Sequence, residues 1–115
     1  YSVNRMVGRK KIEIDGFKLD SDWELKFYNW AKQSNIKLSR VSTPFPYNFE
    51  GKTRSYFPDF YLSELGIYVE VKGYLSPRCK AKIEQFPNRI VTIAWPQIEA
   101  IENGSFGVAE FMKLL

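Results

Sequence analysis

The spacing of apolar residues in the first half of the chain predicts one amphipathic helix. Between residues 21 and 34, apolar side chains recur at positions i, i+4, i+7 and i+8, namely Trp23, Phe27, Trp30 and Ala31. This spacing places them on one face of a helix. Ser21 is a suitable N-cap residue for the first turn. We therefore predict a helix over 21–34 that buries this face.

The segment after this helix has the character of an extended chain followed by a turn. Residues 36–49 alternate in the manner of a strand, but Pro44 and Pro46 restrict them to an edge or bulged strand. The polar segment 50–54 is then expected to reverse the chain.

Two aromatic and β-branched runs, 56–62 and 67–72, come next and are separated by a short loop at 63–66. Such a pair of runs predicts a β-hairpin. The loop length sets the register, which pairs Leu62 with Ile67, Phe60 with Val69 and Asp59 with Glu70. Because side chains alternate along a strand, Glu70 and Lys72 share one face.

The second half of the chain continues with helical and strand patterns. We predict a helix over 77–86 that ends before Pro87, a buried strand over 89–95 and a closing helix over 107–114. The order is helix, three strands, helix, strand and helix. This order predicts a mixed α/β fold, and 115 residues fit a single domain.

Two residue counts exclude whole classes of chemistry. The chain has no histidine, which excludes Ser-His-Asp and Cys-His catalysis and zinc held by histidine. Its one cysteine, Cys79, excludes an internal disulfide and a multi-cysteine metal site. Without disulfides, an intracellular, cytoplasmic location is expected. No apolar run is long enough for a membrane helix.

The positive charge of the chain is clustered. The formal net charge is +4, and the bases gather in 1–11 and 72–89. Clustered bases are expected on a surface that faces phosphate groups, although a solvated basic face explains them equally well on charge alone.

The register of the predicted hairpin places two acids in contact. Asp59 and Glu70 would lie directly opposite each other, where like charges destabilise a sheet. A divalent cation removes this penalty, and carboxylate oxygens suit magnesium. Two acids beside Lys72 form a workable site for phosphodiester hydrolysis. The alternative is an exposed pair of acids that Lys72 neutralises at the surface.

The string YFPDFYLSELGIYVEVKG at 56–73 resembles the PD-(D/E)XK signature of restriction-endonuclease-like nucleases. The matching residues are Pro58-Asp59 and Glu70-Val71-Lys72. Glu24, on the preceding helix, stands where this superfamily places a further acid. The order and spacing are most similar to those of the phage-type endonuclease I Holliday-junction resolvases, over about Glu13 to Trp95.

This resemblance implies a restriction-endonuclease-like core, with a mixed central sheet flanked by helices in α-β-β-β-α-β order. It divides the single nuclease domain into a basic N-terminal arm (1–12), a nuclease core (21–95) and a C-terminal helical segment (96–115). It further implies a magnesium-dependent DNA endonuclease, acting on branched DNA and forming a homodimer, in the host cell cytoplasm if the chain is phage-encoded.

The resemblance also implies a role for each site residue. Asp59, Glu70 and the backbone carbonyl of Val71 would hold the metal, Glu24 would serve a second metal or the water shell, and Lys72 would be catalytic. We expect Mn²⁺ to substitute for Mg²⁺, and Ca²⁺ to bind but support little turnover.

Several interpretations stay open. Ser21-x-x-Glu24 also matches a capping box, which would give Glu24 a structural role. A nicking, homing or transposon-end nuclease would share the same core. A non-catalytic DNA-binding module on this fold is a further alternative. DNA contacts are expected from basic and aromatic residues near the site, namely Lys10, Lys11, Lys52, Arg54, Tyr74, Lys80 and Lys82.

Overall fold

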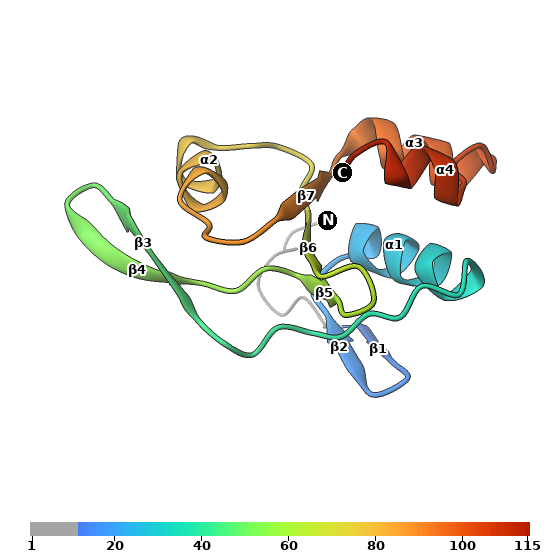
Figure 1. Cartoon of the computed structure of the whole chain (residues 1–115), viewed down its shortest axis with the longest axis horizontal. Helices are drawn as coiled ribbons and strands as arrows, with labels where there is room; N and C mark the ends of the chain where they lie inside the picture. The colour runs from blue at the N-terminus through green and yellow to red at the C-terminus, as the bar shows by residue number, and fades with distance from the viewer. Residues whose placement is uncertain (1–11) are drawn as a thin grey trace, which may run out of the picture.

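The computed structural model describes residues 12–115, so the predicted basic arm with Lys10 and Lys11 lies largely outside the described residues. The fold is mixed α/β, as predicted (Figure 1). Its elements in chain order are β1 (Ile12–Ile14), β2 (Phe17–Leu19), α1 (Asp22–Gln33), β3 (Phe45–Phe49), β4 (Lys52–Tyr56), β5 (Phe60–Leu62), β6 (Ile67–Val71), α2 (Pro77–Glu84), β7 (Ile90–Ile93), α3 (Trp95–Asn103) and α4 (Val108–Met112).

A three-stranded sheet, in the order β5-β6-β7, forms the centre of the molecule. The β5–β6 hairpin has the predicted register, with Phe60 opposite Val69 and Leu62 opposite Ile67. Strand β7 pairs with β6 in parallel, and α2 lies in the connection between them. The sheet therefore combines an antiparallel and a parallel pair.

Helix α1 confirms the first sequence prediction and packs its apolar face on the sheet. Phe27 and Ala31 are fully buried, and the Phe27 ring lies 5.7 Å from that of Phe60 on β5. The α3 and α4 helices lie beside α1, as Figure 1 shows, whereas α2 and the β3–β4 hairpin extend on the opposite side of the sheet. Phe111 of α4 is also fully buried and closes the core against Phe27.

The chain between α1 and β5 differs from the prediction. The turn comprises only Glu50 and Gly51, both at positive φ (53° and 74°), which is the backbone of a two-residue hairpin turn. The segment 52–56, expected to belong mostly to the turn, forms β4 instead. Strand β3 covers only the end of the predicted extended segment 36–49.

The predicted strand 56–62 is divided in two. Strand β4 ends at Tyr56 and β5 begins at Phe60, because Pro58 has no N–H to donate to a ladder and restricts the residue before it. Asp59 lies in this break, outside the β5–β6 ladder. The two helices over 77–86 and 107–114 are present but shorter, at 77–84 and 108–112.

The predicted order α-β-β-β-α-β is therefore wrong in two respects. Four strands, not three, lie between α1 and α2, and a β1–β2 hairpin precedes α1. Helix α3 falls almost entirely within the C-terminal helical segment expected over 96–115, although the pattern itself indicated a helix there only at 107–114. It begins at Trp95, inside the strand expected over 89–95, and the Gln97 side chain accepts a hydrogen bond from the Ala94 N–H at 2.8 Å.

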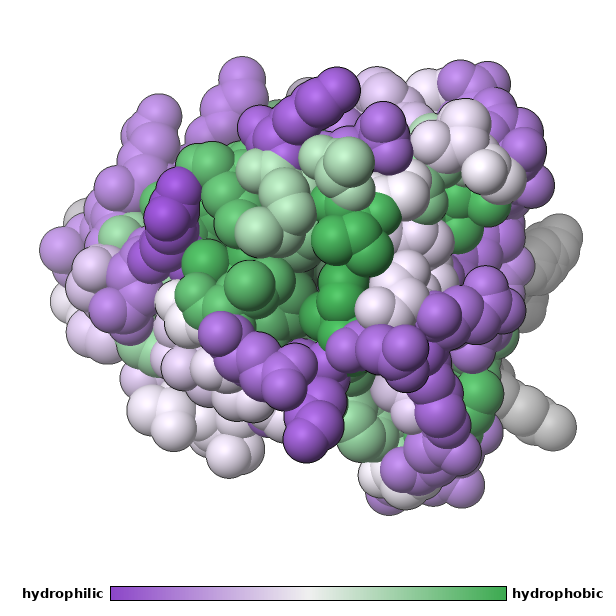
Figure 2. Space-filling view, turned by 45° about the vertical axis from the view of Figure 1, so that its right-hand side comes forward, coloured by the Kyte–Doolittle hydropathy of each residue, from purple (hydrophilic) through white to green (hydrophobic). Residues whose placement is uncertain are grey.

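The molecule presents an apolar face as well as a polar one. Figure 2 shows apolar side chains gathered on the face that the rotation brings forward, with polar side chains around them. Val108 and Met112 of α4 are among the exposed large apolar residues.

Candidate active site

A pocket of about 760 Å³ lies between the start of α1, the Asp59 break and the end of β6. Three of the four predicted catalytic residues, Glu24, Asp59 and Lys72, line it. The remaining lining residues are Ile12, Asp20, Ser21, Asp22, Trp23, Val71 and Gly73. Residues from four separate parts of the chain therefore meet in one hollow.

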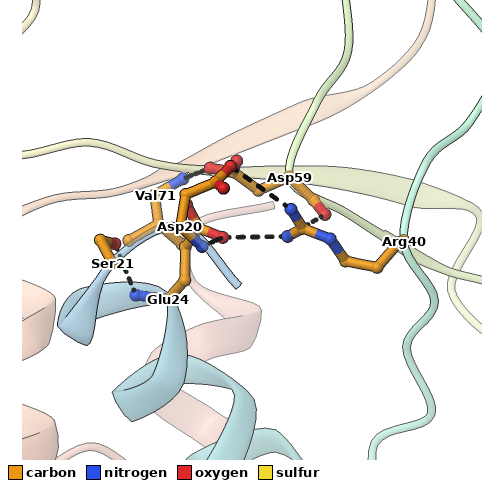
Figure 3. A network of polar contacts seen from close by, with 6 residues as sticks. All are labelled: Asp20, Ser21, Glu24, Arg40, Asp59 and Val71. Atoms are coloured by element: carbon orange, nitrogen blue, oxygen red, sulfur yellow. Dashed lines mark hydrogen bonds and ion pairs between the residues drawn. The ribbon is translucent and has the colours of Figure 1, made fainter. Parts of the chain in front are cut away.

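Asp59 is held by the end of β6. Its Oδ2 accepts a hydrogen bond from the Val71 N–H at 2.8 Å, so the carboxylate connects the break between β4 and β5 to the last residue of β6 (Figure 3). The direct ladder pairing of Asp59 with Glu70 that the register predicted does not form, because pairing begins at Phe60 and Val69.

Burial and neighbouring charges act strongly on Asp59. Burial, followed by the negative charges of Glu70 and Glu24, raises the pKa of Asp59 to about 8. The Val71 N–H and the Arg40 guanidinium act in the opposite direction. A carboxyl group with such a pKa is found where a protein holds acids close together.

Glu70 is the most deeply buried acid of the site, with 4% of its surface exposed. Its Oε1 accepts a hydrogen bond from the Tyr56 hydroxyl at 2.7 Å. Burial raises the pKa of Glu70, while the Tyr56 hydrogen bond and the charges of Lys72 and Lys82 oppose the rise. Glu70 thus lies beside the pocket and is not part of its lining. The alternative interpretation, an exposed pair of acids at the surface, is wrong for Glu70 because its side chain is buried.

Glu24 has contacts at the start of α1 and also lines the pocket. The Ser21 Oγ accepts a hydrogen bond from the Glu24 N–H at 3.2 Å, which is the expected N-cap. The Glu24 carboxylate, however, accepts from the N–H of Asp20 rather than from that of Ser21. The reciprocal half of a capping box is therefore displaced by one residue, and the carboxylate lies in the pocket.

Arg40 is the site residue that the sequence did not indicate. Its Nη1 donates to Glu24 Oε1 at 3.0 Å and to the backbone oxygen of Asp59 at 3.1 Å, and its Nη2 lies 3.7 Å from Asp20 Oδ2 (Figure 3). The guanidinium also lies over the Phe60 ring. One cation therefore connects the start of α1 to the Asp59 break.

The carboxylate oxygens of Glu24, Asp59 and Glu70 suit a hard cation, but their arrangement is not a complete metal-binding site. In residues 12–115, no group of three or more His, Cys, Asp or Glu side chains is placed to hold a metal ion. Each of the three acids has only one oxygen engaged in the hydrogen bonds of this part of the chain. The second oxygens are the hard donors that magnesium prefers.

Of the predicted DNA-binding residues, the five in the described part of the chain do not line the pocket, namely Lys52, Arg54, Tyr74, Lys80 and Lys82. Lys52 and Arg54 are on β4, and Lys80 and Lys82 are on α2. The Lys82 Nζ lies over the Tyr56 ring at 5.3 Å. Two hydrogen bonds of 2.8 Å, between the Gln85 side chain and the backbone of Asn48, join α2 to the β3–β4 hairpin. These bases lie on β4 and α2, and among them Lys82 is near enough to Glu70 for its charge to oppose the rise in the pKa of that acid.

Comparisons with protein-family models, curated proteins and solved structures find no match to this chain. Among the helices of the described part of the chain, none has the length and apolar character needed to cross a membrane.

The raised pKa values of Asp59 and Glu70 predict how the stability of the metal-free protein depends on pH. Between about pH 4 and pH 8 the folded protein binds more protons than the unfolded chain, so the free energy of unfolding falls as pH rises. One such group contributes a slope of up to about 1.4 kcal/mol per pH unit. Urea denaturation in EDTA across this range measures it; stability that rises towards pH 8 would contradict the assignment.

Proposed function

We propose that this chain is a magnesium-dependent DNA endonuclease of the PD-(D/E)XK type. The observation that carries the proposal is the pocket in which Glu24, Asp59 and Lys72 meet, with Glu70 buried beside it. These four residues correspond to the three acids and the lysine of the family pattern. Glu24 is on α1, Asp59 lies in the break before β5, and Glu70 and Lys72 lie on and just after β6.

The arrangement of the elements supports a restriction-endonuclease-like core. Helix α1 packs on the sheet, the β5–β6 hairpin carries the acids, and α2 connects β6 to the parallel strand β7. The β1–β2 and β3–β4 hairpins are additions to this core. On this proposal each addition also contributes to the site, since Ile12 of β1 lines the pocket and the Tyr56 hydroxyl of β4 donates to Glu70.

Each residue of the proposed site has a role. Asp59, Glu70 and the Val71 carbonyl would hold magnesium, with Glu24 at a second metal or the water shell. A bound magnesium ion supplies polarisation of the phosphate and a water of lowered pKa. The Lys72 ammonium stabilises negative charge on the phosphate. Arg40 holds the Glu24 carboxylate at 3.0 Å and so keeps it turned into the pocket.

Within this class, we propose selectivity for branched DNA, as in the phage-type junction resolvases, with a homodimer cutting two strands. A nicking, homing or transposon-end nuclease is the alternative on the same core. A non-catalytic DNA-binding module is a second candidate. It is favoured by one observation, the engagement of Glu24 by Arg40, which places a protein cation beside the acids.

Plasmid nicking tests the proposal. We expect the protein to nick supercoiled DNA with Mg²⁺ or Mn²⁺, to bind it with little cleavage in Ca²⁺, and to leave it intact in EDTA. A four-way junction should be cut faster than the matching linear duplex. The Asp59→Asn variant, purified in the same way, controls for a contaminating nuclease. DNA binding without cleavage in any of these metals would favour the non-catalytic module.

A further inference from the structure

A pair of stacked tryptophans extends outward from the pocket, with Trp23 in its lining and Trp95 beyond the lining residues. Trp23 lines the pocket, and its ring is stacked on that of Trp95, with centroids 5.8 Å apart and an interplanar angle of 29°. A Cβ atom at Gly73 would lie 3.2 Å from the Trp23 ring, so the absence of a side chain there lets the indole pack closely on the backbone. Trp23, the inner member of this Trp23–Trp95 wall, is therefore built into the site.

Trp95 nevertheless leaves much of its indole in water. Its exposed fraction is 52%, which core packing does not explain. The residue is at the first turn of α3, where the hydrogen bond between the Gln97 side chain and the Ala94 N–H fixes the backbone. Tyr74, which follows Gly73 in the chain, is 75% exposed. Exposed aromatic rings on rigid backbone, next to a polar pocket, are typical of a binding surface.

The chemistry beside this wall favours a nucleic acid strand. Lys72 lies on the same pocket and offers a positive charge to a phosphate once a divalent ion has offset the acids of the lining. Aromatic side chains beside a positive charge bind unpaired bases by stacking, and every base has a face that can stack. In an intact duplex these faces are already covered by neighbouring base pairs.

We propose that the Trp23–Trp95 wall binds an unpaired DNA base next to the phosphate in the pocket. The preferred substrate is then DNA that has an unstacked nucleotide at the cleavage position, as at branches, flaps and single-stranded ends. This inference rests on the proposed nuclease function for the identity of the phosphate site, and it supplies a reason for structure selectivity.

Tryptophan fluorescence and oligonucleotide binding test the inference without requiring cleavage. Trp30 is buried and its Nε1 is hydrogen-bonded to the Phe106 backbone oxygen, so Trp23 and Trp95 are the residues that a base can reach. In Ca²⁺, which is expected to support binding but little cleavage, we expect an oligothymidylate to quench the emission, and a duplex of equal length to quench it much less.

Three variants separate stacking from other effects. Trp95→Ala should weaken oligothymidylate binding about tenfold, as the loss of one stacked base predicts. Trp95→Phe keeps a ring and should stay within about threefold of the parent. Met112→Ala, which removes another exposed apolar side chain, should change neither single-strand nor duplex binding.

The outcomes distinguish this inference from the nuclease proposal. Absence of quenching, or an equal loss on single strand and duplex in Trp95→Ala, would overturn the stacking wall. Self-association in the absence of DNA that Trp95→Ala abolishes in sedimentation would also overturn it and assign the surface to a second copy. Plasmid nicking is measured separately. Binding through Trp95 without cleavage would therefore contradict the proposed nuclease function and support the proposed stacking surface.

Discussion

Asp59→Asn should abolish magnesium-dependent cleavage and stabilise the metal-free protein at neutral to alkaline pH. Asparagine has the same shape, and its amide oxygen can still accept the Val71 N–H hydrogen bond. It lacks the charge that burial and the neighbouring acids disfavour. We expect cleavage to fall by at least about a hundredfold, and the free energy of unfolding at pH 8 to rise by about 1–2 kcal/mol.

The pH dependence supplies the control for this prediction. Towards pH 4 the carboxyl group of the unfolded parent also binds its proton, so the parent and Asp59→Asn should approach equal stability. Added Mg²⁺ should raise the melting temperature of the parent at pH 8 more than that of the variant. A variant that melts well below the parent at every pH would show that the Asp59 charge is structural, and Asp59 would then leave the proposed metal site.

Asn and Gln are better tests of these acids than Ala, because each acid accepts a specific hydrogen bond. Removing the Glu70 side chain would leave the Tyr56 hydroxyl buried without its acceptor. An unsatisfied buried donor costs roughly 1–3 kcal/mol, which would obscure any relief of repulsion. The facing-carboxylate argument from the sequence expected no such cost, since it treated the acids as a ladder pair.

The β5–β6 hairpin shows what a sequence pattern can determine. A strand has a side-chain period of two, so a loop of known length leaves one register that buries the apolar set. Leu62, Ile67 and Val69 accordingly pair as predicted and are buried. The prediction failed one residue earlier, at Asp59, because Pro58 ends the strand and lets the carboxylate bond to a backbone N–H instead.

Two elements that the pattern missed had local signals. In the β1–β2 hairpin, Asp15-Gly16 forms the turn between short alternating strands, and this dipeptide is a strong hairpin signal. In α3, Gln97 is at the third helical position and caps the Ala94 N–H. Trp95 follows a buried strand directly, so its apolar character was attributed to that strand.

Arg40 had no local signal at all. Its contacts reach Glu24 and Asp59, which are 16 and 19 positions away in the chain. A single arginine in a non-periodic segment has no pattern that predicts its partners. Reciprocal backbone hydrogen bonds of 2.9 Å between Ser39 and Tyr61 attach this segment to β5, and only that tertiary pairing brings the guanidinium to the acids.

Glu24→Gln and Ser21→Ala form a matched pair that separates catalysis from helix capping. In Glu24→Gln the amide oxygen can keep the bonds from the Asp20 N–H and Arg40, but the bond to Arg40 loses its negative partner. This loss should cost about 1 kcal/mol, the difference between a charge-assisted and a neutral hydrogen bond. Ser21→Ala removes the N-cap acceptor and should cost a similar amount, about 1 kcal/mol.

The two variants are expected to lose similar stability. A difference in their cleavage rates would therefore show that Glu24 acts in the reaction and not only in folding. Ser21→Ala should cleave like the parent below its melting temperature. Glu24→Gln should lose most magnesium-dependent cleavage, since an amide does not supply the negative charge that holds and orients a divalent ion or its water. Initial cleavage rates at saturating DNA, across a magnesium titration, make the comparison. If both variants cleave at the parental rate, Glu24 serves only the start of α1, and the proposed catalytic set reduces to Asp59, Glu70 and Lys72.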